Sequence, residues 1–418
     1  IEITASSTSI ITALAGAAAL TASVGGVGVS LSIGVAVAKN TIDSTVSAFA
    51  RHAELLATDL VARPSSPPTP PDAALPKNIL ISAVADNTVD ATSAAAAVAL
   101  SGGAVGVSVA GGGAVAINTI LGGVSAYAES SRLDAGGDVT VHAESISNIE
   151  AEILAVAGSA AFGGVGVAVS IGVGIALNKV GYEVRGAASE TEYEPLIVSS
   201  YLKDTTVDTY GALTVEAISE ETVDATVRTG SVAISGGMVG VSAAGAGSGT
   251  SNHAGVETTA YIQGGQVKAA DVAVRAEDEI DMTAYAGAAS VAGTAGAFGG
   301  ALSVAVTVAE NITRSTVKSY VKDVSQLLVT GTPVVDAQGY LVKPTPTSSS
   351  FAYTANSGTL EIEATSRTTL DAVAQLASIA AGFALGPTVA GGGARTFNDV
   401  TAITDADLTS TSVVVNGD

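Results

Sequence analysis

A six-fold internal repeat constrains this chain of 418 residues more than any other feature. Six segments share one 13-residue opening that begins with an alternating strand pattern, and these are 1–13, 79–91, 139–151, 213–225, 272–284 and 360–372. An Asn follows each opening, 39 residues after its start in five copies and 38 in the sixth. These residues are Asn40, Asn118, Asn178, Asn252, Asn311 and Asn398. Units that keep their length this strictly are expected to pack in register, each against its neighbours.

We therefore predict one continuous array over 1–418. Its repeats are 1–78, 79–138, 139–212, 213–271, 272–359 and 360–418, the last holding the sixth repeat and the start of a next one. Length varies only after the Asn, where odd repeats carry inserts at 51–78 (Pro-rich), 186–206 and 323–355. Proline is excluded from sheet interiors, so we expect exposed loops, all on one side of the array. Neither end has the polar cap of a solenoid, so we expect both to be cut surfaces of a larger protein.

The second half of each unit alternates with period two, which is typical of a strand. In the first repeat one face holds only bulky residues and the other only small ones. The bulky face is Val27, Val29, Leu31, Ile33, Val35 and Val37, and the small face is Gly26, Gly28, Ser30, Ser32, Gly34, Ala36 and Ala38. Gly-Gly pairs such as Gly25-Gly26 indicate a tight turn before this strand. We expect the small face to pack against a second layer.

The predicted fold is all-β, a tandem-repeat β-solenoid resembling a parallel β-helix, with long strands rich in Gly, Ala and Val. A stacked antiparallel or two-sheet array remains an alternative. The run 153–178 lacks charge and is long enough for a membrane helix, but its strict alternation and its glycines favour a strand. We therefore predict no membrane span.

Odd and even repeats differ at two positions, seven and five residues before the Asn. Odd repeats have Ile33/Val35, Ile171/Val173 and Val304/Val306, whereas even repeats have Gly111/Gly113, Gly245/Gly247 and Gly391/Gly393. The true period is therefore a pair of repeats. We expect the bulky side chains of one type to face backbone that the other type leaves open.

Two series of side chains are candidate ladders. The six asparagines fit an amide ladder or a turn-capping role of the kind that stacks along strands. Nine residues after each Asn lie Phe49, Tyr127, Ala187, Tyr261, Tyr320 and Asp407. The four aromatic members, Phe49, Tyr127, Tyr261 and Tyr320, form either a structural ladder that closes the end of the core or a stripe on which sugars stack. We favour the structural ladder.

Composition excludes several functions. A net charge of −22 argues against nucleic acid, which needs a basic patch. The chain has no Cys, and its three His residues are isolated, so no metal-ligand spacing is present. No nucleophile elbow or phosphate-binding loop occurs, and Ca²⁺ is only a weak option, since Gly136-Gly137-Asp138 is a single partial match. We predict no enzyme, with no catalytic, cofactor-binding or metal residues.

Runs such as 26–42, followed by Ser47-Ala48-Phe49 and later by 136–141, resemble the repeats of large bacterial filamentous adhesins of the haemagglutinin/leukotoxin type. The resemblance implies secretion or a cell-surface location, a β-solenoid and attachment to surfaces. It leaves two functions open: a stalk or adhesive scaffold, and a self-assembling fibre or sheath whose Gly/Ala/Ser face packs on a neighbour. The partners expected are copies of the same repeat and, through the inserts, a cell-surface receptor or polysaccharide.

Overall fold

The computed structural model describes residues 1–57, 77–185, 190–331 and 358–415. These residues form strands and turns with no helix. The all-β prediction is confirmed. Within the described ranges, accordingly, no helix has the length and apolar character needed to cross a membrane.

Eight strands make up the large sheet of the molecule. They are β1 (Glu2–Arg51), β3 (Ile79–Glu129), β5 (Val139–Val180), β8 (Leu196–Lys203), β10 (Leu213–Gln263), β12 (Val272–Lys322), β14 (Leu360–Leu385) and β15 (Thr388–Thr409). Six short strands make a second sheet: β2 (Glu54–Ala57), β4 (Arg132–Ala135), β9 (Thr206–Thr209), β11 (Gln266–Ala269), β13 (Gln326–Val329) and β16 (Val413–Val415). A hairpin joins β6 (Tyr182–Arg185) to β7 (Glu190–Tyr193).

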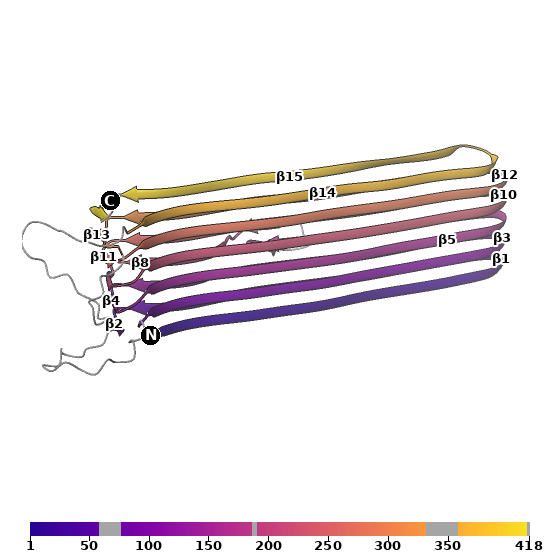
Figure 1. Cartoon of the computed structure of the whole chain (residues 1–418). Helices are drawn as coiled ribbons and strands as arrows, with labels where there is room; N and C mark the ends of the chain where they lie inside the picture. The colour runs from indigo at the N-terminus through magenta and orange to yellow at the C-terminus, as the bar shows by residue number, and fades with distance from the viewer. Residues whose placement is uncertain (58–76, 186–189, 332–357, 416–418) are drawn as a thin grey trace, which may run out of the picture.

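Each repeat forms one layer, in which the long strand runs out, bends back and returns. The bends lie together at one end, which we call the far end, while the chain termini and the short strands lie at the near end (Figure 1). We call the two halves of a layer the outgoing limb and the return limb. They face each other closely, since the hydroxyls of Ser290 and Ser303, on opposite limbs of β12, are 2.7 Å apart.

Successive layers pair in parallel, in the order β1, β3, β5, β10, β12 and β14. β8 completes the third layer and β15 the sixth. The only antiparallel pair among the described strands is β6 with β7. The parallel solenoid is therefore confirmed, and the antiparallel alternative is wrong. Each layer holds two facing limbs and a short near-end strand.

The small face of each strand lies inside the layer, and the bulky face lies outside. In β1, Ser30, Ser32 and Ala36 are buried, whereas Leu31 is 58% exposed. A Cβ added to the inward-facing Gly34 would come within 2.7 Å of the carbonyl oxygen of Ala96, on the opposite limb of the next layer. The expected second layer is thus the other limb of the repeats themselves. The idea that this small face packs on a neighbouring molecule is wrong, because the face is already covered.

The core changes in character along the strands. Near the short-strand sheet it contains large aliphatic side chains such as Ile79, Leu133 and Leu213. Toward the bends the buried clusters consist of alanines, for example Ala161, Ala233 and Ala292. A third wall at the near end leaves room for the large side chains, whereas at the far end two sheets of small residues pack directly on each other.

Glycines form the bends, as the Gly-Gly pairs predicted. Gly103 has φ +153° and Gly237 has φ +150°, conformations that residues with a Cβ rarely adopt. A Cβ at Gly237 would overlap the carbonyl oxygen of Gly163 in the layer below. Only glycine lets the chain reverse while neighbouring layers stay in strand contact.

The prediction for the inserts is partly wrong. The range 186–206 is not a loop, since it contains β7, all of β8 and the start of β9. The third insertion instead leaves the return limb after Val180, where the β6–β7 hairpin begins. The segments 58–76 and 332–357 lie outside the described residues, but the positions just before them, at the ends of β2 and β13, are equivalent near-end positions. The third insertion therefore does not start at the position equivalent to the other two. Their location on one side of the array stays a prediction.

Candidate interaction surface

The structure places the six asparagines in one amide ladder, which is buried in the first five layers. In each of these five layers the side-chain Nδ2 donates to the Oδ1 of the Asn in the next layer. The five N···O distances are 2.8, 2.9, 3.1, 3.0 and 3.1 Å. The ladder spans all six layers and faces the opposite limb.

The same amides tie the two limbs together. Asn252 donates to the carbonyl oxygen of Thr283 at 2.8 Å, and Asn311 donates to that of Asp371 at 2.8 Å. Both acceptors lie on the outgoing limb of the following layer. One donor proton therefore serves the ladder and the other locks the limbs, which satisfies the buried amide group. The role is structural.

The aromatic residues form a stack on the outer side of the return limb. Ring centroids are 5.1 Å apart for Phe49–Tyr127 and 4.8 Å for Tyr261–Tyr320, with nearly parallel planes. The third layer contributes Tyr201 of β8, 4.6 Å from Tyr127 and 4.7 Å from Tyr261. Counting nine residues from Asn178 reached Ala187 because the hairpin insertion shifts the register there. Tyr201 was missed for that reason.

The location of the stack differs from the prediction in one respect, and it distinguishes a structural ladder from a sugar-stacking stripe. The rings lie on an outer face, so they do not close the end of the core as predicted. Their spacing equals the distance between strands, so each inner ring has both faces covered by its neighbours. Stacking with a sugar needs a free ring face, and within the described part of the stack only the outermost rings, Phe49 and Tyr320, have a single stacked neighbour. The stack supports a structural ladder rather than a sugar-stacking stripe.

Two buried carboxyl groups lie side by side in the near half of the core. Burial raises the pKa of Glu221 well above its usual range, and the neighbouring charge of Asp278 adds to the effect. Burial likewise raises the pKa of Asp278 to about 6, against hydrogen bonds from Ser315 that lower it. The hydroxyls of Ser219 and Ser315 donate to the two carboxyls. Burial thus favours the protonated forms of the pair, which links its titration to stability.

A second polar cluster lies under the β6–β7 hairpin, on the outer side of the return limb. Lys179 Nζ donates to Ser251 Oγ at 3.4 Å, and that oxygen is 3.1 Å from His253 Nε2. Burial lowers the pKa of Lys179 to about 7 and that of His253 to about 3. An amine with a lowered pKa beside a hydroxyl is the arrangement of an activated nucleophile. Lys179, however, is only 3% exposed, and the Tyr182 ring packs edge-on against His253 at 5.3 Å, so the cluster offers no entry for a substrate.

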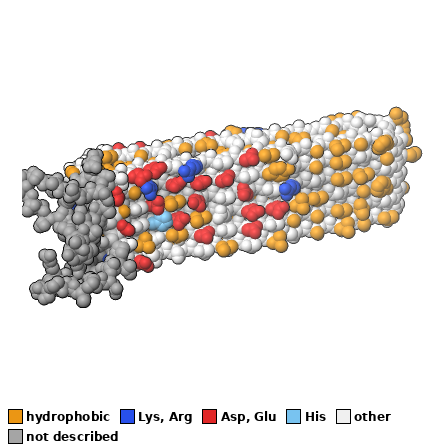
Figure 2. All heavy atoms as spheres, in the orientation of Figure 1, with side chains coloured by type: hydrophobic (Ala, Val, Ile, Leu, Met, Phe, Trp, Pro, Cys, Tyr) orange, Lys and Arg blue, Asp and Glu red, His pale blue; other side chains and the backbone are white. Residues whose placement is uncertain are grey.

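Charge divides the molecule into two halves. Around each bend the chain carries no Asp, Glu, Lys or Arg over the stretches 3–38, 91–128, 153–178, 229–256, 282–309 and 372–394. Figure 2 shows the result: acidic side chains gather on the near half of the visible face, and hydrophobic side chains on the far half. Because the interior close to the bends consists of small residues, the Val, Ile and Leu side chains there point outward.

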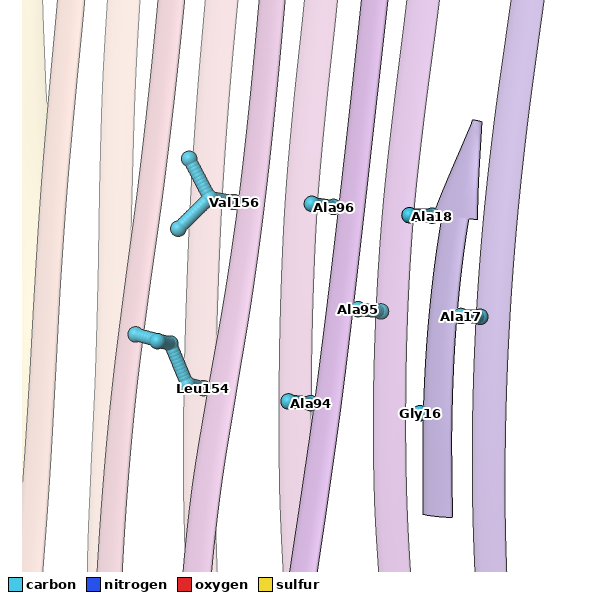
Figure 3. A pocket seen from close by; sticks show the side chains of 8 residues that line it. All are labelled: Gly16, Ala17, Ala18, Ala94, Ala95, Ala96, Leu154 and Val156. Carbon is cyan, nitrogen blue, oxygen red and sulfur yellow. The ribbon is translucent and has the colours of Figure 1, made fainter. Parts of the chain in front are cut away.

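The outer face of the outgoing limb contains a shallow hollow of about 400 Å³ near the first layers. Gly16, Ala18, Ala94 and Ala96 form its low side, and Leu154 and Val156 of the third layer rise beside them (Figure 3). It has no charged or polar side chain among its lining residues. The hollow is therefore a step in an apolar surface, and its lining side chains provide no polar group for catalysis or ligand recognition.

On the return limb, bulky and glycine positions alternate from layer to layer. The pairing register sets Ile33 beside Gly111, Gly111 beside Ile171, and Ile171 beside Gly245. The series continues through Val304 to Gly391, and the row two residues on repeats it. Bulky side chains thus lie beside the glycines of adjacent strands on one outer face, rather than facing them as predicted. Ile171 is 51% exposed, so the surface has ridges and grooves that repeat every two layers.

The apolar far half is the feature that the sequence reasoning missed. The period-two pattern separated the bulky from the small residues and predicted packing of the small face, but it gave no prediction for the exposure of the bulky face. The charge-free stretches centred on the Gly-Gly pairs were the available signal. Among the described residues, no group of three or more His, Cys, Asp and Glu side chains is placed to hold a metal ion.

Comparison with models of protein families, with curated proteins and with solved structures finds no match.

Proposed function

We propose that this chain is a non-enzymatic structural segment of a secreted or cell-surface filament, acting as a stalk or scaffold. The observation that carries the proposal is the unbroken stacking of six layers, with an amide ladder inside and an aromatic ladder outside. Ladders of identical side chains stabilise layer-on-layer contact and have no use in a single active site.

The two outermost layers support the same proposal. Among the described strands, β1 pairs with β3 alone, and the long strands of the sixth layer pair with β12 alone. Each leaves an open strand edge that accepts further parallel strands. The resemblance of 26–42 and 136–141 to filamentous adhesin repeats agrees with an elongated extracellular protein built from such layers. Attachment of a receptor or polysaccharide to the inserts belongs to this proposal as well.

Removal of layers tests the stalk function. Deletion of 139–271 takes out the third and fourth layers and keeps the order of odd and even layers. Spin labels on the first and last layers should then lie about 10 Å closer, because each layer contributes about 4.8 Å. The limb length should not change. A chain that unfolds, or that keeps the original label distance, would show that the layers are not independent spacer units.

A second function, self-assembly into a fibre or sheath, is supported by the apolar outer faces of the far half. Monomeric proteins rarely expose apolar patches of more than a few hundred Å². Electron microscopy of the purified chain distinguishes the two: isolated particles favour the stalk, and ordered lateral bundles favour self-assembly.

A further inference from the structure

We propose that the far half of the return-limb face is an interface between two copies of this chain, in which ridges of one copy fill glycine grooves of the other. The interface deepens the second proposed function, lateral self-assembly, and rests on it. The two copies are displaced by one layer and point in opposite directions along the strands.

The alternation of side chains makes this face complementary to itself. Three ridges, Ile33/Val35, Ile171/Val173 and Val304/Val306, alternate with three grooves, Gly111/Gly113, Gly245/Gly247 and Gly391/Gly393. A displacement of one layer places every ridge that overlaps the partner over a groove. Sheets that pack face to face gain most from such interdigitation. A surface meant for water needs no such alternation.

The grooves are open. No heavy atom lies within 4 Å of a Cβ built on Gly247, Gly391 or Gly393, and the nearest atom to one on Gly245 is the Ile171 Cγ1, at 4.0 Å. The fold itself therefore does not require glycine at these positions. Valine would fit there and would be the better strand former. A side chain of the partner copy in the groove would explain why these positions are glycine.

Charge fixes the direction of the two copies. The chain carries −22, and its charged residues lie mainly in the near half. Copies that overlap only through their charge-free far halves keep these like charges apart. The β6–β7 hairpin stands on the same face, where Tyr193 packs close to Gly255. Opposite directions leave both hairpins outside the overlap.

The area is sufficient for a stable dimer. The apolar band covers about 11 residues along each strand and five overlapping layers, or roughly 36 by 24 Å at standard strand dimensions. That is roughly 900 Å² per copy and roughly 1,800 Å² in total, within the range of specific protein interfaces.

A second copy fits the face better than lipid does. Fluid acyl chains have no two-layer period to match. In addition, β1 and the sixth layer are the outermost of the described strands, and the open backbone groups of an edge strand are costly in hydrocarbon.

The test fills the grooves without disturbing the fold. In the double variant Gly247→Val/Gly393→Val the added Cβ atoms have no atom of the same chain within 4 Å, so circular dichroism and thermal melting should show a native fold. The control is Gly230→Val/Gly293→Val, on the outgoing face, where a Cβ likewise meets nothing within 4 Å. Sedimentation velocity over a range of concentrations gives the dimer dissociation constant of each.

We expect the native chain and the control to dimerise alike, and the groove variant to dimerise at least about tenfold more weakly, because overfilling a close-packed contact is destabilising. A native chain that is monomeric at every concentration, or a groove variant with the dissociation constant of the control, would overturn the proposal. So would a monomeric native chain that co-sediments with phosphatidylcholine vesicles. Bundles that persist in the groove variant would leave self-assembly standing and eliminate only this interface.

Discussion

At the scale of single residues, buried polar side chains are used to hold the layers together. The Asn ladder is the clearest case, because its amides are bonded from layer to layer, and those of Asn178, Asn252 and Asn311 also donate to the facing limb. Its loss leaves unsatisfied groups in a core that has no water-accessible side.

We predict that Asn252→Ala lowers the free energy of unfolding by about 2–4 kcal/mol, the cost of leaving the Asn178 donor and the Asn311 acceptor unpaired. Asn398→Ala, in the exposed outermost layer, should cost about 1 kcal/mol or less. Chemical denaturation followed by circular dichroism compares the two. Equal losses would mean that the ladder adds no stability in the interior.

The Glu221–Asp278 pair predicts an unusual pH dependence. Both pKa values are raised in the folded chain, mainly by burial. Folding therefore favours the protonated forms. The stability they give is fully present below the unfolded pKa of about 4 and is lost as the pH rises through about 6.

The variant Glu221→Gln/Asp278→Asn should flatten this part of the profile and raise the unfolding free energy at pH 8 by roughly 2–3 kcal/mol. Thermal melts between pH 4 and pH 8 measure it. The matched control is Glu220→Gln/Asp281→Asn, whose side chains are exposed on the outer face. An unchanged profile in the buried double variant would show that the pair does not carry the effect.

At the scale of elements, the bend is what makes one strand into a two-limbed layer. Gly237 needs a positive φ and a close approach to the backbone of the layer below. Gly230, which also belongs to β10, needs neither a positive φ nor a close backbone approach.

We predict that Gly237→Ala destabilises the chain by about 2 kcal/mol or more, through strain and backbone overlap. Gly230→Ala should be neutral, or stabilising by about 0.5 kcal/mol. Denaturant midpoints of the two variants test this difference. Equal stabilities of the Gly237→Ala and Gly230→Ala variants would contradict the chain reversal at Gly237.

At the scale of the whole molecule, the repeat and its register were predictable from the sequence. Which face of each strand points inward was not. The constant distance to the Asn fixed which residues lie side by side, since one residue more or less would turn every side chain over. Period two sorted Leu31 from Ser30 and Ser32. It could not say which side faces inward, because small residues let two sheets approach closely while bulky ones are normally buried.

The same limit applied to the candidate interaction surface: the positions of its residues were predictable, and their exposure was not. Ladder positions could be counted wherever a layer is unbroken, and the count failed only at Tyr201, where the β6–β7 hairpin interrupts the return limb. The ridges and grooves were visible as an alternation of Ile33 and Gly111, but their exposure depends on which face is outside. Tertiary packing decides that, and local pattern does not.

The far half is inverted, with small residues inside and bulky ones outside, and cysteine labelling can test this arrangement because the chain has no native Cys. Single variants Ser159→Cys and Ser170→Cys place a thiol at buried positions, and Leu154→Cys places one on the outgoing face at a side chain that is 48% exposed. Under native conditions Leu154→Cys should react with a maleimide as fast as in denaturant, and the two buried thiols should be protected. Fast labelling at Ser159 and Ser170 with protection at Leu154 would mean that the bulky face is the core, and would contradict the account.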